Sequence, residues 1–240
     1  MGVNVEILRN LQDAEKRHDK KAIVIWQNQL NDLKALEEIR LIKQLPHAAM
    51  AEAPNVQRLS KETQRLVEYL KKDGYAVYDY AGRTPLQVKK DGMRFWYLNP
   101  ILENLSSDPS LLAFKSAPED FYLRGSQKLP HEKQLELLAQ ERQSVERAYP
   151  SAGLITREWH APELIDLSLQ HLKTTKIRLQ GKDFGYSYTW TDTCSSDQQG
   201  AYRASVGPWD ETFGLDADFW RSGGVGPRLR LAPVVEITRK

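Results

Sequence analysis

Apolar side chains recur at helical spacing along the first 45 residues. Val5, Leu8 and Leu11 form one stripe, and a second stripe begins at Ile23 after a polar segment. Residues 3–45 contain no glycine or proline, which favours helix throughout. The pattern leaves open a hairpin of two amphipathic helices or one long helix. In either case the stripes must be buried, against the rest of the chain or against a second copy in a coiled coil.

The pattern changes after this helical front. Residues 46–55 are small and bounded by prolines, which predicts a linker. A helix then follows, with Ser60 as a candidate N-cap and Gly74 as the glycine beyond its last turn. We therefore expect an association segment at 1–45, a linker at 46–55 and a mixed domain at 56–240.

Alternating apolar residues surround Asp91-Gly92, a dipeptide typical of a tight hairpin turn. A helix followed by a hairpin is the layout of a winged helix, so residues 58–98 raise the hypothesis of nucleic-acid binding. The next segment, 99–129, contains several prolines and no clear period. It predicts loops and short helical turns.

Helical spacing returns after Pro130, and predicts helices up to Arg147 and over 161–175, with a strand at 153–159 between them. The apolar period then becomes two. The strand candidates are 176–180, 184–191, 201–206 and 228–238. The predicted fold class is α+β: amphipathic N-terminal helices, as a hairpin or coiled coil, followed by a mixed domain that ends in an antiparallel β-rich region at 176–240.

Composition narrows the classes further. The 240 residues include 34 basic and 32 acidic side chains, and this near balance is not typical of a nucleic-acid-binding protein. No apolar run is long enough to span a membrane, and the N-terminus lacks the apolar segment of a secretory signal. We expect a cytoplasmic protein, or a component of a virion or other assembly, with no membrane partner.

The chain has one cysteine, Cys194, which excludes an intrachain disulfide and a cysteine-based metal cage. It is also the nucleophile of an alternative prediction, an enzyme. Asp192 is close in sequence, and His160 and His171 lie upstream, but no recognised catalytic motif surrounds them. We therefore lean towards a protein that is not an enzyme, with no catalytic residues, metal or cofactor.

Acidic residues near the C-terminus include Asp216 and Asp218, which have the spacing that begins a calcium loop. The remaining ligands of such a loop are missing, so we expect a solvated turn. A second alternative, nucleic-acid binding, depends on basic and aromatic side chains in the winged-helix-like segment. Its candidate residues are Arg58, Lys61, Arg65, Arg94 and Trp96.

The C-terminal third is rich in aromatic side chains. Tyr186, Tyr188 and Trp190 alternate, so a strand would direct all three to one face. Such a face either packs a core or stacks on a ligand. The candidate ligand-binding residues are Tyr186, Tyr188, Trp190, Tyr202, Trp209 and Trp220.

Residues 186–233 resemble the C-terminal segment of C-type-lectin-like and formylglycine-generating-enzyme-like domains. The resemblance lies in Trp190-Thr-Asp-Thr, in Ala201-Tyr-Arg and in the closing segment 223–233. The paired cysteines of the enzyme branch and the acidic-Pro-Asn motifs of the calcium-binding branch are missing, so no site residue is transferred. The resemblance implies a β-rich module for a ligand or partner, of the kind found in receptor-binding and phage proteins.

The leading functional prediction is a non-enzymatic binding or assembly protein. Residues 3–45 would associate with a protein partner or with a second copy. The C-terminal aromatic face would contact a protein or a glycan.

Overall fold

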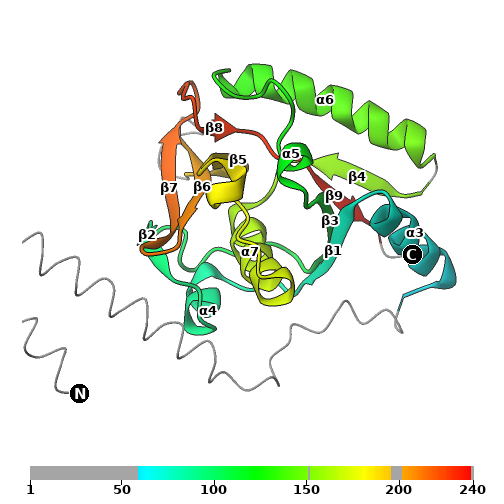
Figure 1. Cartoon of the computed structure of the whole chain (residues 1–240), viewed down its shortest axis with the longest axis horizontal. Coiled ribbons are helices and arrows are strands. Elements are labelled where there is room, and N and C mark those ends of the chain that lie inside the picture. The colour runs from blue at the N-terminus through cyan, green and yellow to red at the C-terminus, as the bar shows by residue number, and fades with distance from the viewer. Residues whose placement is uncertain (1–58, 151, 196–201, 239–240) are drawn as a thin grey trace, which may run out of the picture. The chain divides into compact units, whose positions relative to one another are not determined.

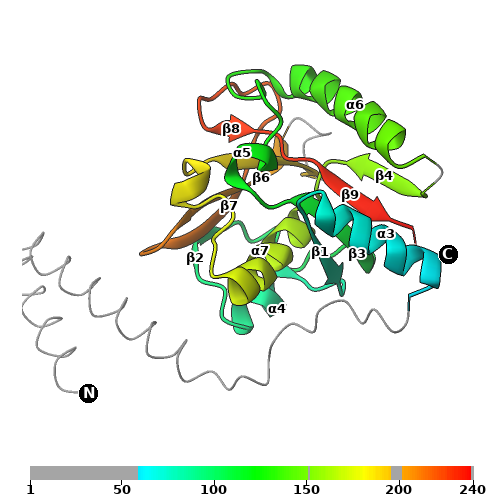
Figure 2. The same ribbon diagram turned by 45° about the vertical axis from the view of Figure 1, so that its right-hand side comes forward.

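The computed structural model describes residues 59–150, 152–195 and 202–238, all within the unit Met50–Lys240. Two β-sheets lie on either side of one buried helix, α7 (Ala161–Thr175), as Figures 1 and 2 show. The α+β class is confirmed. The predicted association segment 1–45 and the linker 46–55 lie outside the described residues.

Sheet A is antiparallel throughout, in the order β1 (Tyr75–Tyr80), β3 (Ser110–Lys115), β9 (Val234–Ile237) and β4 (Leu154–Arg157). Helix α3 (Lys61–Lys72) covers its outer face with Val67 and Leu70, which pack against Leu111 and Val235. Helix α6 (His131–Ala148) adds Val145 to the same cluster. Burial of these apolar stripes stabilises the helices far more than their intrinsic propensity does.

Sheet B has the order β2 (Phe95–Leu98), β7 (Gly214–Arg221), β6 (Tyr202–Asp210), β5 (Tyr188–Cys194) and β8 (Leu229–Arg230). The three central strands are antiparallel, and each edge strand is parallel to its neighbour. Gly214 permits the close approach of β2, since a Cβ there would lie 2.4 Å from the carbonyl oxygen of Arg94. Its φ of +99° also favours glycine.

Helix α7 is buried on all sides from Ala161 to His171 because both sheets pack against it. Phe114 of sheet A and Val206 of sheet B belong to the same core cluster as the helix. At its start, the Ala161 N–H donates to the Thr193 hydroxyl at 2.9 Å, so β5 supplies a cap for the helix. The remaining short elements are α4 (Pro85–Lys90), α5 (Pro118–Phe121) and the 3-10 helix η3 (Lys182–Phe184).

The predicted helices of this domain are confirmed as α3, α6 and α7, and the strand predicted at 153–159 contains β4. Ser60 caps α3 by accepting from the Thr63 N–H at 3.2 Å, and Gly74 follows it with a φ of +82°. These elements have strong local signals, and the tertiary structure agrees with them.

The predicted hairpin at Asp91-Gly92 is wrong. Thr84 and Pro85 begin the short helix α4 instead, and Asp91 is its C-cap. Strand β1 pairs with β3, whereas β2 pairs with β7 in the other sheet. The described part of residues 58–98 is therefore not a winged helix, because β1 and β2 do not pair.

Four further expectations need correction. Segment 99–129, expected to be irregular, contains β3, a strand inside sheet A. Segment 176–180 is a turn after α7, although it alternates. The expected turn at Asp216 and Asp218 lies within β7, and segment 228–238 divides into β8 and β9 in different sheets. The errors at 99–129, at Asp216 and Asp218 and at 228–238 all concern pairing between strands that are distant in the sequence.

Candidate functional site

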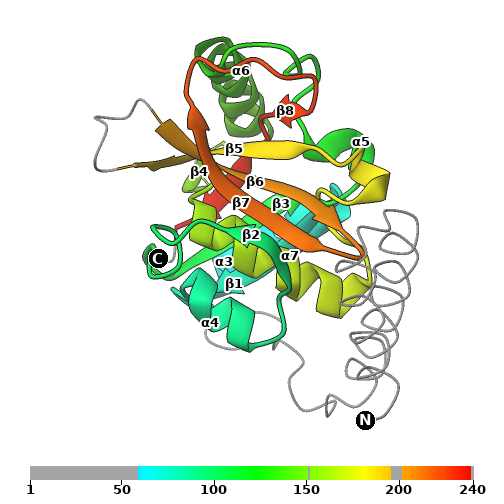
Figure 3. The ribbon, with the colours of Figure 1, turned by 90° about the vertical axis from the view of Figure 1, so that its left-hand side faces the viewer.

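One face of sheet B is turned away from α7 (Figure 3). Aromatic and acidic residues of β2, β5 and β7 lie on this outer face. Val206 pairs with Ala217, and both belong to the core around α7. Residues that alternate with Ala217 along β7 therefore point outward, and Tyr97 is paired with one of them. We call Tyr97, Tyr188, Asp216, Asp218 and Trp220 the outer patch.

Tyr188 contacts two other members of the outer patch, and Asn99 beside the patch contacts a third. The Tyr188 hydroxyl donates to Asp216 Oδ2 at 3.1 Å, and the Tyr188 and Trp220 ring centroids are 5.6 Å apart. Asn99 Nδ2 donates to Asp218 Oδ1 at 2.9 Å. These contacts hold both carboxylates and the indole in defined positions, so little freedom remains for these side chains to lose.

The carboxylates of the outer patch lack compensating cations. Neither Asp216 nor Asp218 makes an ion pair with a residue that the structure describes. Burial raises the pKa of Asp216, and the negative charge of Asp218 raises it further. Burial, followed by the charge of Asp216, raises the pKa of Tyr188 to about 12. Asp216 Oδ1 is enclosed and has no hydrogen-bond partner among the described residues.

Exposed aromatic side chains concentrate on β2, on β7 and on the turn before β7. The exposed fractions are 60% for Trp96, 46% for Tyr97, 47% for Phe213 and 46% for Trp220. The Trp96 and Phe213 rings contact each other with centroids 5.9 Å apart. In Figure 3, no described helix lies in front of β6 and β7. Large exposed aromatic patches of this kind are uncommon on the surfaces of monomeric proteins.

The predicted ligand-binding aromatics have different environments. Trp190 and Trp209 are core residues, with exposed fractions of 0% and 4%. Tyr186 lies before β5 with a φ of +47°, so it does not continue the alternation of Tyr188 and Trp190. Tyr202 is partly buried and its hydroxyl accepts from Arg221 Nε at 3.3 Å. The structure brings only Tyr188 and Trp220 of the six into contact on the outer patch.

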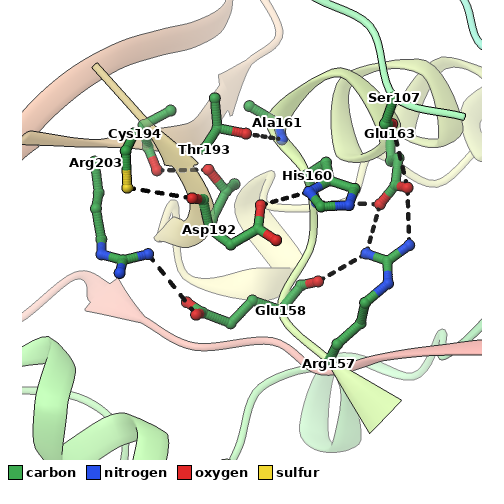
Figure 4. Close-up of polar contacts among 12 residues, drawn as sticks. Ser107, Arg157, Glu158, His160, Ala161, Glu163, Asp192, Thr193, Cys194 and Arg203 are labelled. Atoms are coloured by element: carbon green, nitrogen blue, oxygen red, sulfur yellow. Dashed lines mark hydrogen bonds and ion pairs between the residues drawn. The ribbon is translucent and has the colours of Figure 1, made fainter. Parts of the chain in front are cut away.

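A histidine–aspartate pair lies where α7 begins beside β5 (Figure 4). His160 Nδ1 is 2.6 Å from Asp192 Oδ1, and this hydrogen bond raises the pKa of His160. The exposed Cys194 thiol donates to the backbone carbonyl of Asp192 at 3.3 Å. Figure 4 shows Asp192 between the sulfur and the imidazole, so the thiol and the histidine do not form a nucleophile–base pair.

The charged residues around this pair form ion pairs and hydrogen bonds that link the start of α7 to β4. Arg157 Nη1 and Nη2 donate to the two oxygens of the buried Glu163 at 2.9 and 2.8 Å, and Arg157 Nε donates to Glu236. Glu163 also accepts from the His160 N–H at 3.0 Å. Glu158 lies 2.6 Å from His131 and 3.9 Å from Arg203. The hydrogen-bonding and charged groups of these residues are paired with one another, as expected of a structural network.

The nucleic-acid candidates do not form one surface. Lys61 and Arg65 are exposed on α3, which covers sheet A, whereas Arg94 and Trp96 lie at β2 in sheet B. Figure 1 shows α3 and β2 on opposite sides of the two sheets. Arg58 lies outside the described residues. The predicted grouping of helix and wing is therefore not present among the described candidates.

The sequence reasoning missed Tyr97, Asp216, Asp218 and Phe213 as surface neighbours. The alternation of Asp216, Asp218 and Trp220 was a usable signal, because a strand directs all three to one face. The pairing of β2 with β7 had no comparable local signal, since about 115 residues separate the strands.

No protein-family model, curated protein or solved structure matches the chain. The resemblance of residues 186–233 to lectin-like domains therefore stays a prediction.

No helix in the described part of the chain is long and apolar enough to cross a bilayer. Across 59–150, 152–195 and 202–238, no three histidine, cysteine or acidic side chains cluster in a way that could hold a metal ion.

Proposed function

We propose that this protein is a non-enzymatic binding protein whose contact surface for a protein partner is the outer patch with the adjoining Trp96 and Phe213. The observation that supports the proposal is the concentration of exposed aromatics on β2, β7 and the turn between β6 and β7. Tryptophan and tyrosine are enriched at the energetically dominant positions of protein interfaces. Contacts such as that between Tyr188 and Trp220 reduce the entropy lost on binding.

Selection of peptides from a random displayed library tests this proposal. Peptides that bind the full chain are expected to lose about tenfold or more in affinity for Trp220→Ala and Tyr97→Ala, because hot-spot aromatics contribute about 2 kcal/mol or more. Tyr69→Ala is a matched control, since Tyr69 is 59% exposed on α3, away from sheet B. Thermal unfolding of each variant establishes that it is folded.

Two outcomes would contradict the proposal. Peptides that bind all three variants equally would place the contact surface elsewhere. A failure to select peptides, combined with glycan-array binding that Trp220→Ala removes, would make the partner a glycan.

Residues 3–45 form the second part of the proposal, as a segment for association with a partner or a second copy. Its support is the two apolar stripes in the sequence, which must be buried. We expect the full chain to form particles that contain more copies than those of a chain that lacks residues 1–45. Equal oligomeric states, measured by light scattering, would remove self-association from the proposal.

A further inference from the structure

We infer that the outer patch binds a basic segment of a protein partner, with an arginine or lysine side chain against the Trp220 ring beside the Asp216 carboxylate. This inference rests on the proposed function and adds the chemistry of the partner. Three features of the patch support it: negative charge without an ion pair among the described residues, exposed indole and phenol rings, and Tyr188, which contacts both Asp216 and Trp220.

The negative charge comes from Asp216 and Asp218, which project from the same face of β7. Among the described residues, neutral groups donate hydrogen bonds to them: the Tyr188 hydroxyl to Asp216, and the Asn99 amide and the Phe219 backbone N–H to Asp218. A partly buried carboxylate without a cation is costly, and the raised pKa of Asp216 reflects this cost. A cation supplied by a partner would compensate the charge and release this penalty.

The aromatic component is Trp220, a residue 46% exposed whose ring is tilted by 50° against that of Tyr188. Arginine and lysine are attracted to the face of an aromatic ring, and tryptophan gives the strongest such interaction. The planar guanidinium of arginine can also pair with a carboxylate while it lies on a ring. A neutral or acidic segment could use the ring but not the carboxylates.

Two basic residues at the margin of the patch, Arg203 and Arg228, would favour an acidic segment instead. Arg203 pairs across the strands with Trp220, but Glu158 lies 3.9 Å from its guanidinium. Arg228 is exposed and lies just before β8. Its charge lowers the pKa of Tyr188, but burial and Asp216 raise this pKa by more. Arg203 lies on β6 and Arg228 just before β8, whereas both carboxylates lie on β7. An acidic segment would have to approach these carboxylates, which would repel it.

The library selection gives the test. Peptides that depend on Trp220 are expected to be enriched in arginine and lysine. Replacing these residues by glutamine in the best peptide should weaken binding to the full chain about tenfold. Asp216→Asn and Asp218→Asn should weaken the original peptide similarly and leave the glutamine peptide unaffected, as a double-mutant cycle requires for a direct pair. Glu68→Gln on α3 is the matched control and should change nothing.

The outcomes separate this inference from the proposed function. Peptides that need Trp220 but show no basic enrichment, or that ignore both aspartate variants, overturn the inference and leave the proposed function standing. Enrichment in acidic residues overturns it in favour of Arg203 and Arg228. Binding that is insensitive to Trp220→Ala, or no selected peptide at all, overturns both.

Discussion

The two faces of sheet B are built from alternate residues of the same strands but have opposite environments. On β7, Leu215 and Ala217 are fully buried against the core around α7, whereas Asp216, Asp218 and Trp220 point away from it. The outer face itself is covered near β5, where Trp190 packs against Leu138 of α6. An aromatic residue of this sheet is therefore a core residue or a surface residue according to the layer that covers it.

The test with the largest expected effect compares the replacement of covered tryptophans with that of an exposed one. Trp209→Ala and Trp190→Ala should each destabilise the fold by about 3–5 kcal/mol, because they leave large cavities. Trp220→Ala should cost about 0.5 kcal/mol, as is usual for exposed positions. Denaturant unfolding measures all three. A large loss for Trp220→Ala would mean that the outer patch is part of the core.

The helix that covers the inner face gives a second test. Burial lowers the pKa of His171 to about 4, and the Tyr78 hydroxyl lies 2.8 Å from its Nδ1. The folded state keeps this imidazole neutral, whereas the unfolded chain binds a proton below pH 6.5. The contribution of His171 to the free energy of unfolding is therefore complete above pH 6.5. It decreases towards pH 4, by up to about 3 kcal/mol.

His171→Gln should accordingly unfold with a smaller difference in stability between pH 7 and pH 4.5 than the unchanged protein. Thermal melts at both pH values measure this difference. An unchanged difference would show that His171 becomes protonated within the fold.

The outer face predicts an effect of the opposite direction. Because burial raises the pKa of Asp216, its charged form is disfavoured in the fold, and stability increases as the pH falls through the folded pKa. Asp216→Asn should therefore raise stability at pH 7, by about 1 kcal/mol or less, and have little effect at pH 3. Tm measurements at both pH values test this, and a loss of stability at pH 7 would mean that a cation compensates Asp216.

The smallest expected effect concerns His160 and Asp192, a partly exposed pair beside the start of α7. The hydrogen bond to Asp192 raises the pKa of His160, so its contribution is complete below pH 6.5 and is lost as the pH rises through the folded pKa. Asp192→Asn should lower stability more at pH 5.5 than at pH 8.5, by under about 1 kcal/mol for so exposed a pair. Equal losses at both pH values would indicate a purely neutral hydrogen bond.

Local patterns were sufficient for the three long helices of the described domain, α3, α6 and α7. Ser60, Gly74 and the apolar spacing between them specify α3 without any distant contact, and the same holds for the apolar stripe of α7. The alternation of Tyr188 and Trp190 likewise indicated that both belong to one strand face. These properties depend on residues a few positions apart, so one sequence contains the whole signal.

The sequence by itself thus determined the α+β class, the three long helices of this domain and the aromatic richness of its C-terminal third. Only the tertiary structure decided that β2 joins β7, that Asp216 and Trp220 share a face with Tyr97, and that α6 covers Trp190 but not Trp220. The reason is physical: strand pairing and coverage by another layer arise from contacts between residues far apart in the chain. The alternation of side chains along a strand defines two faces but does not say which one is covered.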